Sequence, residues 1–583
     1  MSDPAQQTQT DNVFRVVIMS GAPPRVLARL LTEICRHDSR RVTGVLYWVQ
    51  KPLPLNKRVR NFVSQLHKPA YLRYVADRLV STVAGQCRRL GHFLARVAHA
   101  GFPDTADFGV AELEEHCRQL GIPFQTTDQF HSEQSLAFVS AGQPDLGIVY
   151  GTPILKPKLF QIPRHGSVNL HQRKVPDYRG GGPIGLWELL DGAQEIGVTV
   201  HRVAAKLDSG AIIRAVEIPI QPFDTLVSLE AKAHVTGIDL LVATVDDFAM
   251  GTVTEVPQTG SGRMFRNPKP EDLPELKRQI RLLRGPQPAE RTYPRWKLLV
   301  RCLLFGPFLV ARNWYRRLTG TFPIVILYHH VITDRPHFMG MSTDRFLSQM
   351  QYLRRYYNIV DLKTAQRLLQ SGRVSEPTIV LTFDDGYRDN VLNLRAAALD
   401  GDVPATLYIC SEQLELGRPF AHDLQHGCRG FAPMTWDEVR KMEAWGFDFG
   451  AHTRTHFDCG STDEEMLLQE IIECRREIEE QVGHDIQDFS FPLGLPPNIS
   501  RPAFDIAARN YSTVASAYGG VNRCGQPGTH HLYRVPHLSS LLEVELQLQS
   551  ALVLGQPVYW TGGEGSSKQP GRHRVGEPEL VDV

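Results

Sequence analysis

Residues 378–387 read TIVLTFDDGY, an apolar run that ends abruptly in two adjacent carboxylates, Asp384 and Asp385, followed by a glycine. This pattern is typical of a buried parallel strand, and α/β folds place their chemistry at the carboxyl ends of such strands. Two neighbouring carboxylates repel each other unless a cation or a proton separates them. The stretch therefore predicts a parallel-sheet domain with a cation or a shared proton near the end of this strand.

Further ligands for a cation occur downstream in the segment HTRTH at residues 452–456, where two imidazoles are four residues apart. One helical turn or a tight loop could aim both rings at the same point. One Asp plus two His with open positions would suit a mononuclear hydrolytic metal site. Alone, the first motif is as readily an acidic turn and the second a pair of surface histidines. Their occurrence together and in this order favours the metal site.

The two motifs resemble those of the polysaccharide deacetylase family, also called carbohydrate esterase family 4 or the NodB-homology domain. The resemblance runs from about residue 322 to about 558 and includes ILYHHV at 326–331, MTW at 434–436 and FSFPLG at 489–494. It implies a distorted β/α barrel in which Asp384 is the general base. It also implies a divalent metal, with zinc the expected ion, held by Asp385, His452 and His456.

Two further positions bear on this resemblance. Many family members carry an arginine two residues before the proline of the FSFPLG segment, where it orients the base, but this chain has Ser490 there. The family's general acid is a histidine near the end of the domain, and His537 is the best placed candidate. A histidine with a purely structural role is the alternative at that position.

A second group of polar residues lies in the first half of the chain. Asn169 and His171 alternate in SVNLH at 167–171, so on a strand they project from the same face, and Asp208 follows in a DSG segment. A neighbouring amide and imidazole can bind an oxyanion and move a proton, and a carboxylate can tune the imidazole. Any one of these residues alone would more often be structural.

The ordered set resembles the formyltransferase family that uses 10-formyltetrahydrofolate, which acts on glycinamide ribonucleotide, methionyl-tRNA or sugar nucleotides. The resemblance covers roughly residues 14–266 and implies Asn169, His171 and Asp208 as catalytic residues and 10-formyltetrahydrofolate as the donor. The tRNA enzymes typically have Ser-Leu-Leu-Pro where this chain reads QRKVP at 172–176. No nucleic-acid-binding barrel follows, so we expect no nucleic acid as substrate.

The fold class is thus α/β, with an N-terminal doubly wound formyltransferase-like domain followed by a distorted β/α barrel deacetylase domain. A chain of 583 residues is long enough for two such domains. Within the second domain, Ser461 and Glu464 form a candidate capping box for a following helix. The expected order is a disordered start at 1–12, the first domain at 13–267 with a basic helical insertion at about 51–98, a Pro-rich linker at 268–320, the second domain at 321–560, and a disordered tail at 561–583.

The composition of the chain indicates its cellular compartment and the kinds of partner it can bind. The 64 Lys and Arg nearly balance the 63 Asp and Glu, so no overall field attracts nucleic acid. Nine cysteines without a Cys-x-x-Cys pair fit a reducing compartment, and the polar start shows no secretory signal, so we expect a cytoplasmic protein. A basic segment with two tryptophans at 295–317 could lie on the inner face of an anionic membrane or pack between the domains.

These features predict a bifunctional enzyme, with N-formyl transfer followed along the chain by metal-dependent hydrolysis of an N-acyl amide, either acetyl or formyl. The expected substrates are an amino sugar, a sugar nucleotide or a lipid-linked sugar. The alternatives are a binding or scaffold protein built on two degenerate enzyme folds, or a chain in which only one domain is active. A non-catalytic groove has no need of all seven polar residues of the two motif sets, which argues against the scaffold.

Overall fold

The computed structural model describes residues 13–51, 54, 56–57, 60, 63–64, 71–72, 75, 108–260, 262–284, 295–399, 401–526, 530–538 and 540–549. Two compact units are present, one formed mainly by residues before 288 and the other mainly by residues after it. The predicted start at 1–12, most of the insertion at 51–98 and the tail at 561–583 lie outside the described residues.

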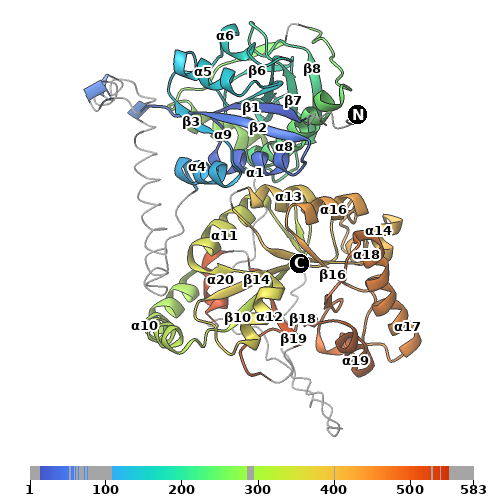
Figure 1. The fold of residues 1–583 in the computed structure, drawn as a ribbon. Coiled ribbons are helices and arrows are strands. Elements are labelled where there is room, and N and C mark those ends of the chain that lie inside the picture. Colours follow the sequence, from blue (N-terminus) through green and yellow to red (C-terminus); the bar gives the residue numbers. More distant parts are fainter. Residues whose placement is uncertain are drawn as a thin grey trace, which may run out of the picture. The chain divides into compact units, whose positions relative to one another are not determined.

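The first unit is built on a seven-stranded sheet with the order β3-β2-β1-β4-β5-β7-β8 (Figure 1). The first five strands in this order are parallel, and β7 and β8 add an antiparallel edge. The strands are β1 Phe14–Ser20, β2 Arg40–Trp48, β3 Phe124–Thr127, β4 Leu146–Tyr150, β5 Ser167–His171, β7 Glu195–Arg202 and β8 Ile212–Pro219. The predicted doubly wound α/β domain is confirmed, with a mixed sheet.

Helices cover both faces of this sheet (Figure 1). Helix α1 buries Leu27, Leu30, Leu31 and Ile34, the spacing of one helical face, and it packs against two other helices on that side, α4 and α8. Helix α8 begins with a capping box at Thr225 and ends at Gly251, whose φ of +70° suits a glycine. The helices are α1 Pro24–Cys35, α4 Val110–Gln119, α5 Glu133–Ala141, α6 Pro157–Phe160, α7 Leu186–Leu190, α8 Leu226–Met250 and α9 Leu273–Arg284, with a small parallel pair β6 Tyr178–Gly180 and β9 Arg263–Phe265.

The second unit contains a closed barrel of seven parallel strands. Strand β10 pairs with both β14 and β19, which joins the two ends of the sheet, and β13 Asn358–Ile359 pairs with β14 outside this ring. In ring order the strands are β10 Ile324–His329, β14 Thr378–Phe383, β15 Ala405–Ile409, β16 Asp448–Ala451, β17 Asp488–Ser490, β18 Thr513–Ser516 and β19 His531–Pro536. The predicted β/α barrel is confirmed.

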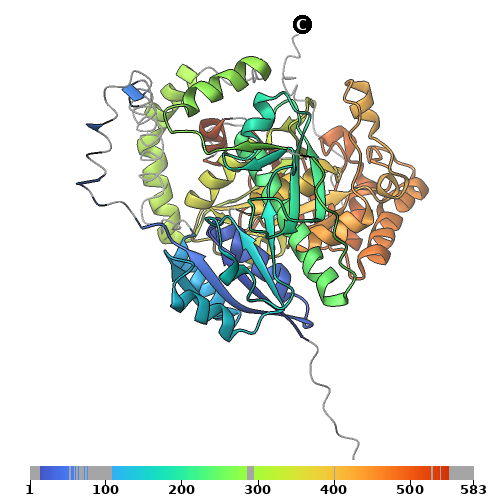
Figure 2. The same ribbon diagram turned by 90° about the horizontal axis from the view of Figure 1, so that it is seen from above.

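Helices surround the barrel, and Figure 2 shows those drawn in orange gathered on one side of its strands. They are α10 Arg295–Thr319, α11 Thr343–Tyr356, α12 Leu362–Gln370, α13 Asp389–Ala398, α14 Ser411–Leu416, α15 Ala421–Gln425, α16 Trp436–Ala444, α17 Glu464–Leu468, α18 Cys474–Val482, α19 Arg501–Asn510 and α20 Leu541–Leu548. A π-helical segment, Gln469–Glu473, joins α17 to α18. The predicted capping box was wrong, because Asp463, and not Ser461, caps α17 by accepting a hydrogen bond from the Met466 amide.

Asp488 is the first residue of β17, so it lies at the amino ends of the barrel strands, whereas Asp384 and Asp385 lie at their carboxyl ends. Its burial makes the stability of the barrel depend on pH. Burial, with a smaller contribution from the Asp448 and Asp361 carboxylates, raises the pKa of Asp488 to about 6, although the Thr513 hydroxyl donates a hydrogen bond to it. Because the folded chain then holds this proton more tightly than the unfolded chain, the stabilising contribution is lost as the pH rises through about 6.

We therefore expect Asp488→Asn to raise the free energy of unfolding at pH 8 by about 2 kcal/mol. The gain should shrink as the pH falls toward 4, where Asp488 is protonated in the folded wild-type protein. Thermal unfolding of both proteins at pH 4 and pH 8 measures this difference. An equal change in Tm at the two pH values would contradict the assignment.

Candidate active sites

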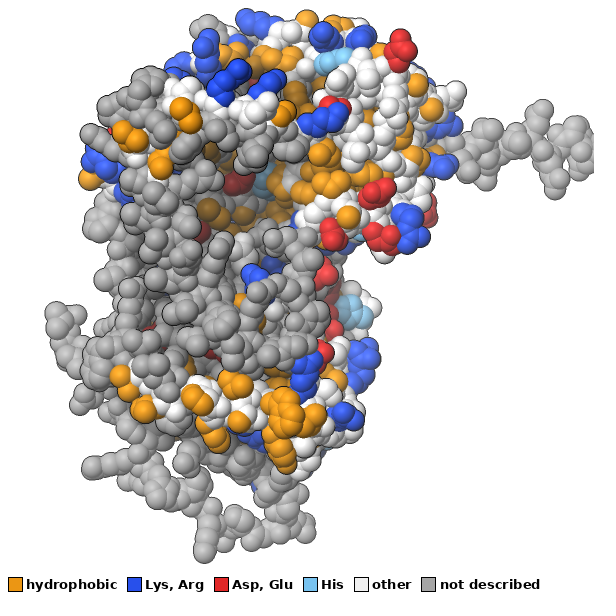
Figure 3. All heavy atoms as spheres, turned by 90° about the vertical axis from the view of Figure 1, so that its left-hand side faces the viewer, with side chains coloured by type: hydrophobic (Ala, Val, Ile, Leu, Met, Phe, Trp, Pro, Cys, Tyr) orange, Lys and Arg blue, Asp and Glu red, His pale blue; other side chains and the backbone are white. Residues whose placement is uncertain are grey.

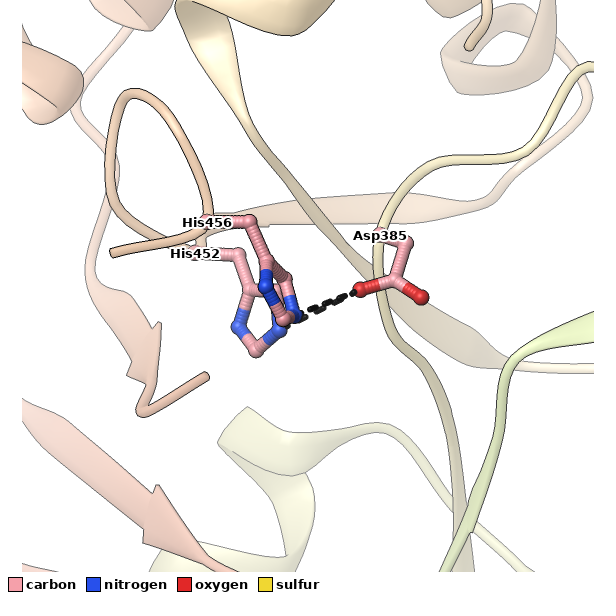
Figure 4. A group of neighbouring side chains, drawn as sticks. All are labelled: Asp385, His452 and His456. Carbon is pink, nitrogen blue, oxygen red and sulfur yellow. Dashed lines mark ion pairs between the residues drawn. The ribbon is translucent and has the colours of Figure 1, made fainter. Parts of the chain in front are cut away.

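The barrel brings Asp385, His452 and His456 together at the carboxyl ends of its strands (Figure 4). Asp385 Oδ1 lies 3.5 Å from His452 Nε2 and 3.3 Å from His456 Nε2, and one ligand atom from each residue lies within 4.8 Å of the others. Both Asp385 oxygens are buried and accept no hydrogen bond from the described part of the chain. A buried carboxylate without donors beside two imidazoles fits a divalent cation such as zinc.

Residues 452–456 form a tight loop after β16, the second of the two geometries that the sequence allowed. Thr453 and His456 have φ angles of +59° and +63°, in the region that non-glycine residues rarely adopt. Glu470 in the π-helical segment holds this loop, because its carboxylate accepts hydrogen bonds from the Thr455 amide at 3.0 Å and the Thr455 hydroxyl at 2.8 Å. The irregular helix thus fixes the direction of the ligand loop.

His452 is also oriented by the backbone. Its Nδ1 donates a hydrogen bond to the Ser490 carbonyl at 2.8 Å. This bond leaves Nε2 as the atom that faces Asp385, so the imidazole is held in the tautomer that a metal ligand requires.

Asp384 is held by an arginine that the sequence motifs did not identify. Arg534 on β19 donates from Nη1 to Asp384 Oδ1 at 2.6 Å and from Nη2 to Oδ2 at 2.9 Å. Its Nη2 also donates to Ser490 Oγ at 2.7 Å. The guanidinium therefore occupies the space beside Ser490 and supplies the cation that the resemblance placed at position 490. The signal in the sequence was a single arginine inside the strand HLYRVP at 531–536.

Opposing effects set the charge of Asp384. Burial raises the pKa of this carboxyl, but the Arg534 guanidinium and then the His452 imidazole lower it, and the net pKa lies below its usual value. Asp384 is thus ionised at neutral pH, as a general base must be.

His537 directly follows β19, and its ring stacks on that of His329 at 4.9 Å. Burial, with the charge of a neighbouring imidazole, His330, lowers the pKa of His537 to about 4. This environment favours the neutral imidazole at pH 7, and the role of general acid stays a prediction.

A further imidazole, which the sequence did not point to, lies next to His456, with the two ring centroids 5.0 Å apart, and close to the second carboxylate oxygen of Asp385. His422 Nε2 is 3.7 Å from Asp385 Oδ2 and 2.9 Å from the Tyr387 hydroxyl. That hydroxyl donates to Asp423 Oδ1, which also lies 2.8 Å from His337 Nε2. His422 therefore stands beside the candidate metal ligands within a buried polar network.

Metal binding by variants distinguishes a histidine that is a metal ligand, such as His452, from one that only lies nearby, such as His422. We expect the His452→Ala protein to bind a divalent ion about 10-fold to 100-fold more weakly than the wild-type protein, because the substitution removes a ligand. His422→Ala is the matched control and should retain the ion. Metal analysis of both purified variants after dialysis against zinc-containing buffer tests this, and equal zinc content in the two would contradict the ligand assignment.

In the first unit, β5 and the loop after β7 bring Asn169, His171 and Asp208 to one place. His171 Nδ1 lies 3.9 Å from Asp208 Oδ2, which is longer than a hydrogen bond, and His171 Nε2 donates to the Tyr178 carbonyl at 2.9 Å. Asp208 has a φ of +47° and accepts a hydrogen bond from the Gly180 amide at 2.9 Å. The three residues predicted from the motif order are thus neighbours in space.

His201 on β7 connects the same residues. Its Nε2 lies 3.2 Å from Asn169 Nδ2 and 3.7 Å from Asp208 Oδ1. His201 ends the segment GVTVH at 197–201 and was not among the three residues predicted as catalytic. The strand pairing Asn169↔His201 between β5 and β7 explains the contact.

The charges of this site favour a neutral base. Burial lowers the pKa of His171, and the Asp208 carboxylate opposes this effect only in part. Burial raises the pKa of Asp208, but the His201 and His171 imidazoles and the Gly180 amide lower it, so the carboxyl lies below its usual pKa. A neutral imidazole next to an ionised carboxylate can accept a proton.

Comparisons with known proteins agree with this division of the chain. A family model described as formyl transferase matches residues 105–245, and one described as polysaccharide deacetylase matches residues 371–509. The first range contains Asn169, His171 and Asp208. The second contains the TFDDG and HTRTH motifs and ends before β19.

The curated relatives include a methionyl-tRNA formyltransferase of Thermodesulfovibrio yellowstonii, 34% identical over 151 residues, which are 26% of this chain and 48% of the relative. The chain thus spans about half the length of the curated relatives it matches. Among solved structures, a Streptococcus pyogenes deacetylase in complex with acetate is 20% identical with a TM-score of 0.34, covering 39% of this chain and 98% of that chain. A sugar N-formyltransferase from a Shewanella species is 16% identical with a TM-score of 0.27, covering 43% and 76%. The chain is a fusion of a formyl transferase N-terminal domain and a polysaccharide deacetylase domain.

Proposed function

We propose that the chain is a bifunctional enzyme that transfers a formyl group from 10-formyltetrahydrofolate to the amine of an amino sugar or its conjugate, and hydrolyses an N-acyl amide on a related carbohydrate. The observation that supports it is the assembly of two complete sets of polar groups, Asn169 with its neighbours in one unit and Asp384 with its neighbours in the other. A scaffold protein on degenerate folds would not need either set.

In the hydrolase, Asp385, His452 and His456 would hold the divalent metal. When bound, such an ion lowers the pKa of a water molecule and polarises the amide carbonyl. Asp384, kept ionised by Arg534, accepts the proton of the attacking water. The proton that Asp384 has accepted ends on the leaving amine, with His537 as the predicted group that takes up this proton and passes it on, since His537 is neutral in the resting site. His452 keeps its orientation through the Ser490 carbonyl.

In the transferase, the substrate amine attacks the formyl carbon of the folate donor. The Asn169 amide donates a hydrogen bond to the oxyanion that develops on the formyl oxygen. His171 accepts the proton that the amine loses, and Asp208 stabilises the imidazolium that results. The folate product leaves without its formyl group.

The two activities share a substrate class if they act in sequence. Removal of an N-acetyl group leaves a free amine, and the transferase then formylates that amine. Because both domains belong to one chain, the effective concentration of the free-amine intermediate at the second site is raised. We propose this acyl replacement on an amino sugar that is free, nucleotide-bound or carried by a lipid, in the cytoplasm where folate is available. Removal of formyl by the hydrolase is the second candidate, and the pair would then need a further enzyme acting between the two steps.

The test gives the full-length protein an N-acetylated sugar conjugate and 10-formyltetrahydrofolate, with products followed by mass. Acyl replacement requires the free amine to accumulate with His171→Ala and the acetylated compound to remain unchanged with Asp384→Asn. Formation of the formylated product by Asp384→Asn would rule the sequence out. Turnover of an N-formylated conjugate in place of the acetylated one would favour the second candidate.

A further inference from the structure

Helix α10 has an exposed apolar face. At roughly 100° per residue, the exposed apolar side chains that the structure describes on this helix fall within about 120° of the helix circumference. They are Val300, Leu304, Phe308, Trp314, Tyr315 and Leu318, exposed by 44% to 70%. Figures 1 and 2 draw α10 at the rim of the second unit, and Figure 3 shows hydrophobic side chains gathered in a row on this side of that unit.

The opposite face of α10 packs against its own unit. Leu309 and Asn313 are buried at 8% and 4% exposure. Gln549 directly follows α20, and its Oε1 accepts hydrogen bonds from Asn313 Nδ2 at 3.0 Å and from Arg312 Nη2 at 2.9 Å. The helix is therefore fixed to the barrel through one side, and its apolar side is held outward.

The charges and aromatic residues of α10 identify what covers this face. Residues 295–319 contain six Lys and Arg and no Asp or Glu, with basic residues near both ends. Trp296 and the Trp314-Tyr315 pair also lie near the two ends. Basic residues beside an apolar stripe with aromatic ends are the pattern of a helix that lies in the interface of an anionic bilayer.

The helix does not cross the bilayer. Among the described residues, no helix combines the length and hydrophobicity that a membrane span needs. A helix of 25 residues is roughly 37 Å long, which suffices for an interfacial helix lying parallel to the surface.

We propose that the outward face of α10, defined by the six exposed apolar residues Val300, Leu304, Phe308, Trp314, Tyr315 and Leu318, binds the surface of an anionic lipid bilayer and holds the second unit there. This goes beyond the proposed catalytic function and does not depend on it, because no residue of α10 belongs to either candidate active site. A substrate carried by a lipid would meet the enzyme at this surface.

The full-length protein should float with phosphatidylcholine vesicles that contain phosphatidylglycerol, with a bound fraction at least about tenfold higher than on phosphatidylcholine alone. The double variant Leu304→Glu/Phe308→Glu should lose most of this binding. Ile154→Glu is the matched control, since Ile154 is an apolar residue with 70% exposure in the first unit, and it should bind like the wild-type protein. Circular dichroism confirms that each variant is folded.

Equal binding to neutral and anionic vesicles, or unchanged binding of the folded double variant, would overturn the proposal. So would a wild-type protein that stays off all vesicles. If size-exclusion chromatography showed a wild-type dimer that the double variant converts to a monomer, the face would belong to a second copy and the proposal would also fail. Hydrolysis of a water-soluble N-acetylated sugar reports the catalytic assignment separately, because it requires no membrane.

Discussion

Replacement of Arg534 by Met is expected to lower kcat for amide hydrolysis by about 100-fold or more, the typical contribution of a positioned general base. The guanidinium makes two hydrogen bonds to Asp384 and is itself 1% exposed, so its loss leaves a buried carboxylate without its counter-ion. The pKa of Asp384 should then rise, and the side chain should lose its fixed direction. Steady-state kinetics on an N-acetylated sugar measures kcat and KM separately, and the larger change is expected in kcat.

The loss of a buried ion pair also costs on the order of 3 to 5 kcal/mol of stability, so two further variants separate catalysis from unfolding. Arg534→Lys keeps the charge but not the paired geometry and should retain intermediate activity. Ser490→Arg/Arg534→Met moves the guanidinium to the position expected from the family resemblance and should recover part of kcat. A folded Arg534→Met protein with wild-type kcat would show that Asp384 needs no such partner.

Replacement of Asn169 by Ala is expected to slow formyl transfer by about 100-fold or more, as removal of an oxyanion donor typically does. Its amide lies next to His201 and on the same face of β5 as His171, where the developing charge would sit. Release of tetrahydrofolate with an amino sugar nucleotide as acceptor measures the rate.

Hydrolysis by the same variant provides the control, since Asn169 belongs to the other compact unit. Asn169→Ala should hydrolyse the N-acetylated sugar at the wild-type rate, and Asp384→Asn should transfer formyl at the wild-type rate. Retention of full formyl transfer by Asn169→Ala would remove this residue from the mechanism.

The elements whose residues are adjacent in sequence were predictable. The apolar run before Asp384 is a strand of the barrel, and the alternation of Asn169 and His171 places both side chains on one face of β5. Helix starts were less certain, because Ser461 and Asp463 are equally suitable caps by residue type and the structure uses Asp463.

Contacts between distant segments could not be predicted from one sequence. Arg534 and Ser490 are 44 residues apart, and only closure of the barrel brings the guanidinium to Asp384. His422 reaches Asp385 from a short helix that no motif marks. The backbone conformation of the sites was equally unpredictable. Among the described residues, four of the six non-glycine positions with positive φ belong to the two candidate sites, namely Asp208, Asp385, Thr453 and His456. Such conformations are sustained only by the surrounding packing.

The order of strands in the barrel has a consequence for biosynthesis. Strand β19 is the last strand along the chain, yet it pairs with β10, the first, and it carries Arg534 and leads directly into His537. During translation at roughly 5 to 20 residues per second, the formyl transferase unit can finish folding while the barrel is still open. The hydrolase site can be completed only after β19 has left the ribosome. An incomplete nascent chain therefore contains Asp385, His452 and His456 but lacks Arg534 beside Asp384, and the candidate site in the barrel is the later of the two to be completed.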